Sequence, residues 1–173
     1  MYVAENAIWN YPEPLEGAVD VSDYASIYWH KMDAWFEEDE EVFVHAKDPY
    51  KRVDALQTSR EVLVKLNGET IAKTCKAVLL LETGLPHRYY LPKKDVQMAF
   101  LQPSDTITRC PYKGEAQYYT VTIGDDKYAD LCWYYRYPTP ELNKLANYIC
   151  FPQGKVDCYV DGVLEQRPRS RWD

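Results

Sequence analysis

Short apolar runs separated by turn sequences are the feature that most limits how this chain can fold. Residues 62–66 and 70–72 flank Asn67-Gly68, which is the strongest short signal for a β-hairpin. Two more turn sequences separate apolar runs further along the chain, Gly124-Asp125-Asp126 and Asp161-Gly162. Strands this short and this frequent are typical of antiparallel sheets rather than of alternating strands and long helices. The sequence therefore predicts a mainly β fold made of two small antiparallel sheets.

One short helix is predicted after residue 138. Thr139 suits the N-cap position and Pro140 suits the first helical position. Apolar residues then follow at helical spacing, at Leu142, Leu145, Ala146 and Ile149. This pattern predicts an amphipathic helix of about three turns.

An internal repeat organises the chain. The order Trp, Tyr-Pro-x-Pro, Ile-x-aromatic, apolar-Asp-x-aromatic occurs first over residues 9–36 and again over residues 133–160. We therefore expect one short helix per repeat. Three parts are predicted: the C-terminal part of a degenerate first repeat at 1–50, a complete domain at 51–165 and a polar tail at 166–173.

Composition excludes several classes of function. The net charge of −7 argues against nucleic-acid binding, which needs a surplus of Lys and Arg. The five cysteines form no C-x-x-C pair, so a zinc site and a secreted disulfide framework are not expected. No apolar run reaches membrane-spanning length, and residues 1–10 lack a signal-peptide pattern. We expect a cytoplasmic protein without a metal or other cofactor, in which the acidic run 37–41 is a solvated turn rather than a cation site.

The stretch from Glu82 to Gly114 contains most of the candidate site residues. Within an extended strand, Arg88 and Tyr90 point to one face of the sheet. An arginine beside a phenol can bind a carboxylate or phosphate. The alternative is a structural arginine that pairs with Glu82 or Asp95, and the sequence favours neither interpretation.

A second group of candidates follows the predicted turn at residues 103–106. Thr108 and Cys110 would share one strand face, and Lys113 lies in the next turn. A cysteine near a lysine can act as a nucleophile where the site is partly exposed and electropositive. Lys113 is a candidate anion partner or amine nucleophile. The alternative is an inert cysteine beside a surface lysine, and a Cys–His arrangement would need His87 close to Cys110 in space.

At these segments the chain resembles the bacterial and fungal family known as domain of unknown function 427, which is also filed under a nucleotidyltransferase name. The resemblance covers residues 52–165. It is carried by Arg52-Val53-Asp54, Glu82-Thr83-Gly84-Leu85-Pro86-x-Arg88-Tyr89-Tyr90-x-Pro92, Pro103-Ser104-Asp105-Thr106, Cys110-Pro111-Tyr112-Lys113-Gly114, Tyr137-Pro138-x-Pro140 and Val156-Asp157-x-Tyr159-x-Asp161-Gly162.

The resemblance implies a β-tent fold similar to methionine-sulfoxide reductase B and to the ligand-binding domain of cereblon. Such folds often hold a small ligand among aromatic side chains between two sheets. Their zinc is bound by two C-x-x-C pairs, which this chain lacks, so zinc is not carried over. The predicted site therefore combines the catalytic candidates Cys110 and Lys113 with the substrate-binding candidates Glu82, Arg88, Tyr90, Thr108, Tyr119 and Trp133.

Three functions follow from these residues. The first is a small-molecule pocket for an anionic or polar ligand, with or without catalysis. The second is a nucleotidyltransferase-like enzyme, which would need a divalent metal, although neither standard phosphate-binding loop is present. The third is a non-catalytic binding or structural module. In all three, the N-terminal aromatic segment, with Trp9, Trp29, Trp35 and Phe36, is expected to pack on the complete domain or on a second chain as a homodimer.

Overall fold

A computed structural model describes residues 3–37, 40–41, 43–45, 48 and 50–168. The chain divides into two compact units, residues 1–46 and residues 47–173. Among the described residues, no helix is long and apolar enough to cross a membrane.

The first unit contains two short antiparallel ladders. β1 (Ile8–Asn10) pairs with β2 (Ala25–Ile27), and β3 (Phe36–Glu37) pairs with β4 (Glu40–Glu41). Between them lies the 3₁₀ turn η1 (Trp29–Lys31), whose first residue, Trp29, stacks on Trp35 with ring centres 4.6 Å apart. Residues 38–39 of the acidic run lie outside the described residues, as do residues 169–173 of the predicted tail.

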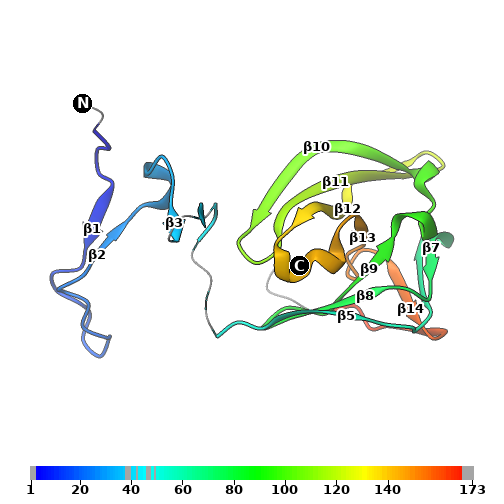
Figure 1. The fold of residues 1–173 in the computed structure, drawn as a ribbon, viewed down its shortest axis with the longest axis horizontal. Helices are drawn as coiled ribbons and strands as arrows, with labels where there is room; N and C mark the ends of the chain where they lie inside the picture. Colours follow the sequence, from blue (N-terminus) through cyan, green and yellow to red (C-terminus); the bar gives the residue numbers. More distant parts are fainter. Residues whose placement is uncertain (1–2, 38–39, 42, 46–47, 49, 169–173) are drawn as a thin grey trace. The chain divides into compact units, whose positions relative to one another are not determined.

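The second unit is built on a seven-stranded antiparallel sheet, in which each strand pairs with its spatial neighbours. In spatial order its strands are β10 (Leu101–Cys110), β11 (Gly114–Ile123), β12 (Asp126–Pro138), β13 (Tyr148–Cys150), β9 (Arg88–Pro92), β8 (Val78–Glu82) and β5 (Val53–Gln57). The sheet is strongly curled, because β10 and β11 arch over β12 and β13 while β8 and β5 run along the opposite side (Figure 1). The short turns η2 (Lys93–Asp95) and η3 (Met98–Phe100) connect β9 to β10.

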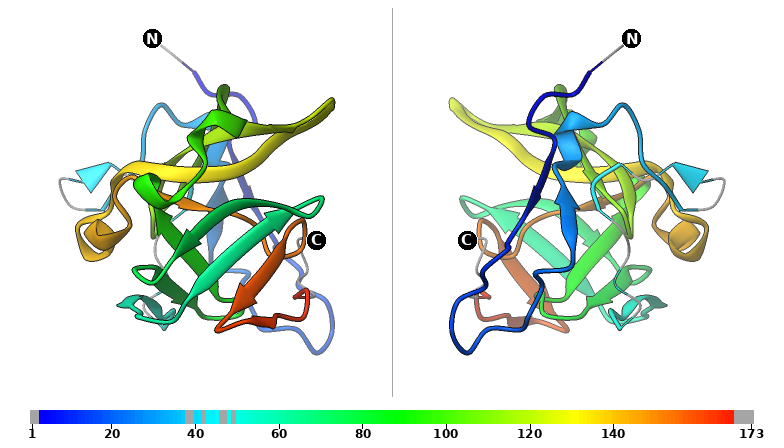
Figure 2. Two further views of the ribbon diagram at one scale, coloured as in Figure 1. Left: turned by 90° about the vertical axis from the view of Figure 1, so that its right-hand side faces the viewer. Right: turned by 90° about the vertical axis from the view of Figure 1, so that its left-hand side faces the viewer.

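A four-stranded antiparallel sheet covers one face of the larger sheet, as the left view of Figure 2 shows. Its strands are β15 (Val163–Leu164), β14 (Asp157–Val160), β6 (Val62–Leu66) and β7 (Glu69–Thr74). Asn67-Gly68 joins β6 to β7 and Asp161-Gly162 joins β14 to β15, and all four residues have positive φ. This left-handed backbone is what a two-residue hairpin turn requires, so both predicted turns are confirmed.

Two hydrophobic cores lie on opposite faces of the seven-stranded sheet. The first fills the space between the two sheets and includes Val64, Ile71 and Tyr89. The second lies on the other face, includes Leu80 and Tyr90, and is covered by η4 (Pro140–Leu145). Because successive side chains of a strand point to opposite faces, each central strand contributes to both cores.

The mainly β class is confirmed, but the prediction of two small sheets is wrong. Short turns alone do not show how many hairpins join side by side, and here one of the sheets has seven strands. The turn predicted at residues 103–106 is also wrong, because these residues lie inside β10, where the register shifts between Pro103 and Ile107. This shift interrupts the regular ladder, and β10 lies at the edge of the sheet, where a proline is tolerated.

The predicted amphipathic helix is wrong as well. Only the short 3₁₀ segment η4 forms, and Leu142 interrupts it with non-helical angles. Asn147 then turns the chain with a φ of 61°, and Ile149 lies on β13 between β12 and β9. Leu142, Leu145 and Ile149 are all buried, but on two different elements. One helix per repeat is therefore not found among the described residues, where every helical turn is of the 3₁₀ type.

Candidate functional site

The side of the seven-stranded sheet that carries the second core also carries most of the predicted site residues. Alternation along β9 places Arg88 and Tyr90 on this side and Tyr89 on the other. Trp133 on β12 lies on the same side as Tyr90, since its indole Nε1 donates a hydrogen bond to the Tyr90 hydroxyl at 3.2 Å. We call this side the curled face.

A buried ion pair closes the curled face. The Lys113 ammonium lies 2.5 Å from the Glu82 carboxylate, and the two side chains are only 12% and 10% exposed. Glu82 ends β8 and Lys113 lies in the β10–β11 turn, yet β8 and β11 are four positions apart in the strand order. In a flat sheet they would be separated by roughly 19 Å. The ion pair therefore spans the inside of the curl.

The turn that carries Lys113 is held in place by its backbone. Thr139 donates from its hydroxyl to the Tyr112 carbonyl at 2.8 Å and from its N–H to the Lys113 carbonyl at 3.3 Å. Gly114 follows with a φ of 96°, and a Cβ at this position would lie 3.0 Å from the Tyr137 carbonyl oxygen. Only glycine fits both the left-handed backbone and this close approach.

Arg88 is the unusual cation of the curled face. Its guanidinium carbon lies 5.6 Å from the centre of the Trp133 ring, and the side chain is half-buried. Neither carboxylate proposed as a structural partner is available, because Glu82 pairs with Lys113 and Asp95 accepts a hydrogen bond from Thr74 at 2.7 Å. Within the described part of the chain, Arg88 forms no ion pair or hydrogen bond.

Aromatic and hydroxyl groups continue from Arg88 across the curled face. Tyr118 on β11 lies beside Trp133, with ring centres 6.2 Å apart, and its hydroxyl is 2.9 Å from that of Thr108 on β10. Tyr90 is fully buried, and burial raises the pKa of its phenol well above the usual value. The phenol of Tyr90 therefore stays neutral and can exchange hydrogen bonds with its neighbours.

The half-buried thiol of Cys110 lies at the end of β10, near the phenol of Tyr135. Tyr135 is buried, which raises its pKa, and the neighbouring Cys110, Cys150, Tyr118 and Glu82 side chains raise it further. Cys150 is fully buried, and its pKa is raised to about 12, chiefly by burial. Of the cysteines on this face, Cys110 is thus the accessible one.

The sequence pattern missed Tyr118, Tyr135 and Cys150. Tyr135 could have been predicted from strand alternation, because it is two residues from Trp133 along β12 and so shares its face. Tyr118 could be found only from the pairing of β11 with β12, where it lies opposite Trp133.

The structure does not bring Tyr119 to the curled face. Tyr119 packs in the first core, stacked on Tyr134 at 5.2 Å, and the Lys93 ammonium lies 3.9 Å from the Tyr134 ring centre. Tyr118 and Tyr119 are adjacent aromatics that point to opposite faces, so Tyr119 does not join Arg88, Tyr90 and Trp133. The space between the two sheets, where a ligand was expected by resemblance, contains the packed first core instead.

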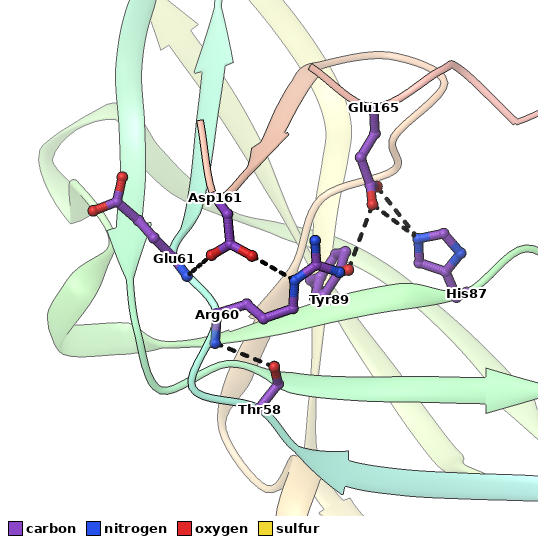
Figure 3. Close-up of polar contacts among 7 residues, drawn as sticks. All are labelled: Thr58, Arg60, Glu61, His87, Tyr89, Asp161 and Glu165. Carbon is purple, nitrogen blue, oxygen red and sulfur yellow. Dashed lines mark hydrogen bonds and ion pairs between the residues drawn. The ribbon is translucent and has the colours of Figure 1, made fainter. Parts of the chain in front are cut away.

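A separate polar cluster links the end of β15 to β9 (Figure 3). The Glu165 carboxylate accepts hydrogen bonds from Tyr89 at 3.4 Å and from the Gln153 amide at 2.7 Å, and it lies 3.3 Å from His87 Nε2. Burial, together with the Glu165 charge, raises the pKa of Tyr89 to about 12. His87 thus lies against Glu165 and Tyr89 rather than beside Cys110.

Among the described residues, no group of three or more His, Cys, Asp or Glu side chains is arranged to hold a metal ion. All five cysteines are free thiols.

Comparison with known proteins identifies a family. A family model described as a domain of unknown function (DUF427), whose short name abbreviates NTP transferase, matches residues 2–38 and 54–162. No curated protein gives a significant match to the chain.

Proposed function

The chain belongs to the DUF427 family, whose function is unknown, and we propose that it binds a small anionic or polar molecule on the curled face of its seven-stranded sheet. The ligand's anionic group would meet Arg88, and its body would lie against Trp133 and Tyr118.

Arg88 is the observation that carries this proposal. A guanidinium that is half-desolvated by an aromatic ring loses hydration, and this loss is offset when an anion binds. Its planar donors match a carboxylate or phosphate in a bidentate geometry. Thr108 and Tyr118 add hydroxyl groups that can bond the polar parts of the same ligand.

The thiol of Cys110 gives this site a candidate nucleophile. Lys113 is already paired with Glu82, so in this proposal it acts as a fixed cation and not as an amine nucleophile. The proposal has two levels: Arg88 is needed for binding, and Cys110 is needed only if the site is catalytic.

Binding is tested with a panel of small carboxylates, phosphates and sulfonates, read out as ligand-induced thermal shifts. We expect at least one class to stabilise the protein, Arg88→Ala to abolish that shift, and Arg88→Lys to keep part of it. Circular dichroism should show that Arg88→Ala remains folded. Unfolding of Arg88→Ala would show that the arginine is structural, and an undiminished shift would place the ligand elsewhere.

The nucleophile is tested with iodoacetamide and peptide mapping. We expect Cys110 to be alkylated faster in the folded protein than in a peptide of residues 107–113. An equal or slower rate would exclude Cys110 as a nucleophile and leave a non-catalytic binding module.

The family name favours a second candidate, a nucleotidyltransferase-like activity. A nucleotide that stabilises the protein only together with Mg²⁺ or Mn²⁺ would support this candidate over an anion site that works without metal. We also place the protein in a reducing, cytoplasmic compartment, and the five free thiols support that placement.

A further inference from the structure

A pocket lies away from the curled face, where the end of β7 meets η2. Its volume is about 400 Å³, and its lining residues are Lys73, Thr74, Cys75, Lys76, Lys94 and Asp95. None of them belongs to the site described above. A volume of this size is within the range of pockets that bind small ligands, roughly 300–1,000 Å³.

The charges around this pocket are predominantly positive. Lys73 pairs with Glu61 at 3.0 Å, but Lys76 and Lys94 make no ion pair with any residue that the structure describes. The single carboxylate of the lining, Asp95, accepts a hydrogen bond from the Thr74 hydroxyl. In a chain with a net charge of −7, this is a local surplus of positive charge.

The wall that carries these charges is anchored in the fold. Thr74 is only 4% exposed, and its hydroxyl also accepts the Lys76 N–H at 3.0 Å. The η2 side is tied to β7 by the Gln97 N–H, which donates to the Ile71 carbonyl at 2.8 Å. The lysine stems therefore start from fixed backbone on both sides of the pocket.

We propose that this pocket binds a small polyanion with two or more phosphoryl groups, such as a diphosphate or a nucleoside diphosphate. Lysine ammonium groups act as compact point charges and are common phosphate binders, as in the lysine of phosphate-binding loops. Exposed single charges are screened by salt, so a ligand with several charges gains more from two unpaired lysines than a monoanion does.

Cys75 provides a direct probe of this proposal, because its thiol is exposed in the pocket lining. The thiolate attacks an aromatic disulfide reagent, forms a mixed disulfide and releases one coloured aromatic thiolate. In a Cys110→Ser background the remaining cysteines other than Cys75 are buried. The quantity measured is the rate with the dianionic thionitrobenzoate disulfide divided by the rate with the neutral dipyridyl disulfide. We expect this ratio to be at least about threefold higher for Cys75 than for a free thiol in solution. Added salt should reduce that ratio.

Binding is then read as protection of Cys75. Pyrophosphate or adenosine diphosphate at about 1 mM should slow the reaction with the neutral reagent severalfold, and citrate should protect less. Lys76→Gln with Lys94→Gln should remove both the protection and the preference for the anionic reagent. The matched control, Lys127→Gln with Lys155→Gln, removes the same charge from exposed sites outside the pocket and should behave like the parent.

Three results would overturn the proposal. They are no protection by either phosphate compound, equal protection in the Lys76/Lys94 variant, and equal protection by citrate. The assay does not involve Arg88, so its outcome is independent of ligand binding on the curled face.

Discussion

Tyr89 shows how a single residue links the stability of this protein to pH. Its hydroxyl donates to Glu165 from a buried position, and its pKa is raised from about 10 to about 12, first by burial and then by the carboxylate. The folded state therefore retains the phenolic proton after the unfolded chain has lost it. The stability that this residue contributes is complete below pH 10 and is lost as the pH rises through 12.

The variant Tyr89→Phe tests this linkage. At pH 8 the variant should be less stable than the parent by about 1 kcal/mol, because one hydrogen bond is lost. Between pH 10 and 12 the difference should shrink and then reverse, since phenylalanine has no proton to lose. Urea unfolding at a series of pH values measures the difference, and other titrating groups cancel in it. A difference that is constant with pH would contradict the raised pKa.

At the residue scale, the sequence predicted the positions of some side chains but not of others. Arg88 and Tyr90 could be placed on one face from strand alternation alone, and the structure places them so. Tyr118 and Tyr119 could not be assigned to faces from the sequence, because adjacent aromatics differ only in register, which the partner strand decides. The partner of Lys113 could not be predicted either, because Glu82 approaches it only through the curl of the sheet.

At the scale of elements, the Glu82–Lys113 pair acts as a cross-link between β8 and the β10–β11 turn. Removing one partner leaves the other charge buried and unpaired, which typically costs about 3–5 kcal/mol. We expect Glu82→Gln to destabilise the protein by about 3 kcal/mol, and Glu82→Leu with Lys113→Met to cost less than the sum of the single changes.

A double-mutant cycle measured by urea unfolding checks this expectation. Arg109 and Glu115 form a matched control in the same hairpin, since their ion pair at 3.1 Å is largely exposed. Glu115→Gln should cost less than about 1 kcal/mol. Equal costs at Glu82 and Glu115 would show that the buried pair does not hold the curl closed.

Hairpins could be predicted from the sequence because their turns are local. Asn67-Gly68 and Asp161-Gly162 adopt the left-handed backbone that their residue types favour. The helix after Thr139 could not be judged locally, because Ile149 pairs between β12 and β9, and this pairing overrides the apolar spacing of residues 142–149. The size of the larger sheet depends on the same long-range pairing.

At the scale of the whole molecule, both hydrophobic cores belong to the second unit. We therefore predict that a chain starting at residue 48 folds alone, with an unchanged far-ultraviolet spectrum and a cooperative urea transition. The same comparison tests the proposed role of the N-terminal aromatic segment. If that segment joins two chains, sedimentation should show a dimer for the full chain and a monomer for the fragment. A fragment that fails to fold would show that the first unit is needed to complete the second.

The position of β13 also determines when the large sheet can be completed during biosynthesis. This strand is three residues long, yet it is the only link between β12 and β9 in the spatial order of the large sheet. On the ribosome the chain emerges from its N-terminus, so β5 to β12 are all available before residues 148–150 appear. Until then the pairing that joins β12 to β9 cannot form, and we expect a nascent chain that stalls before residue 148 to leave the inner edges of both strands unpaired and open to aggregation.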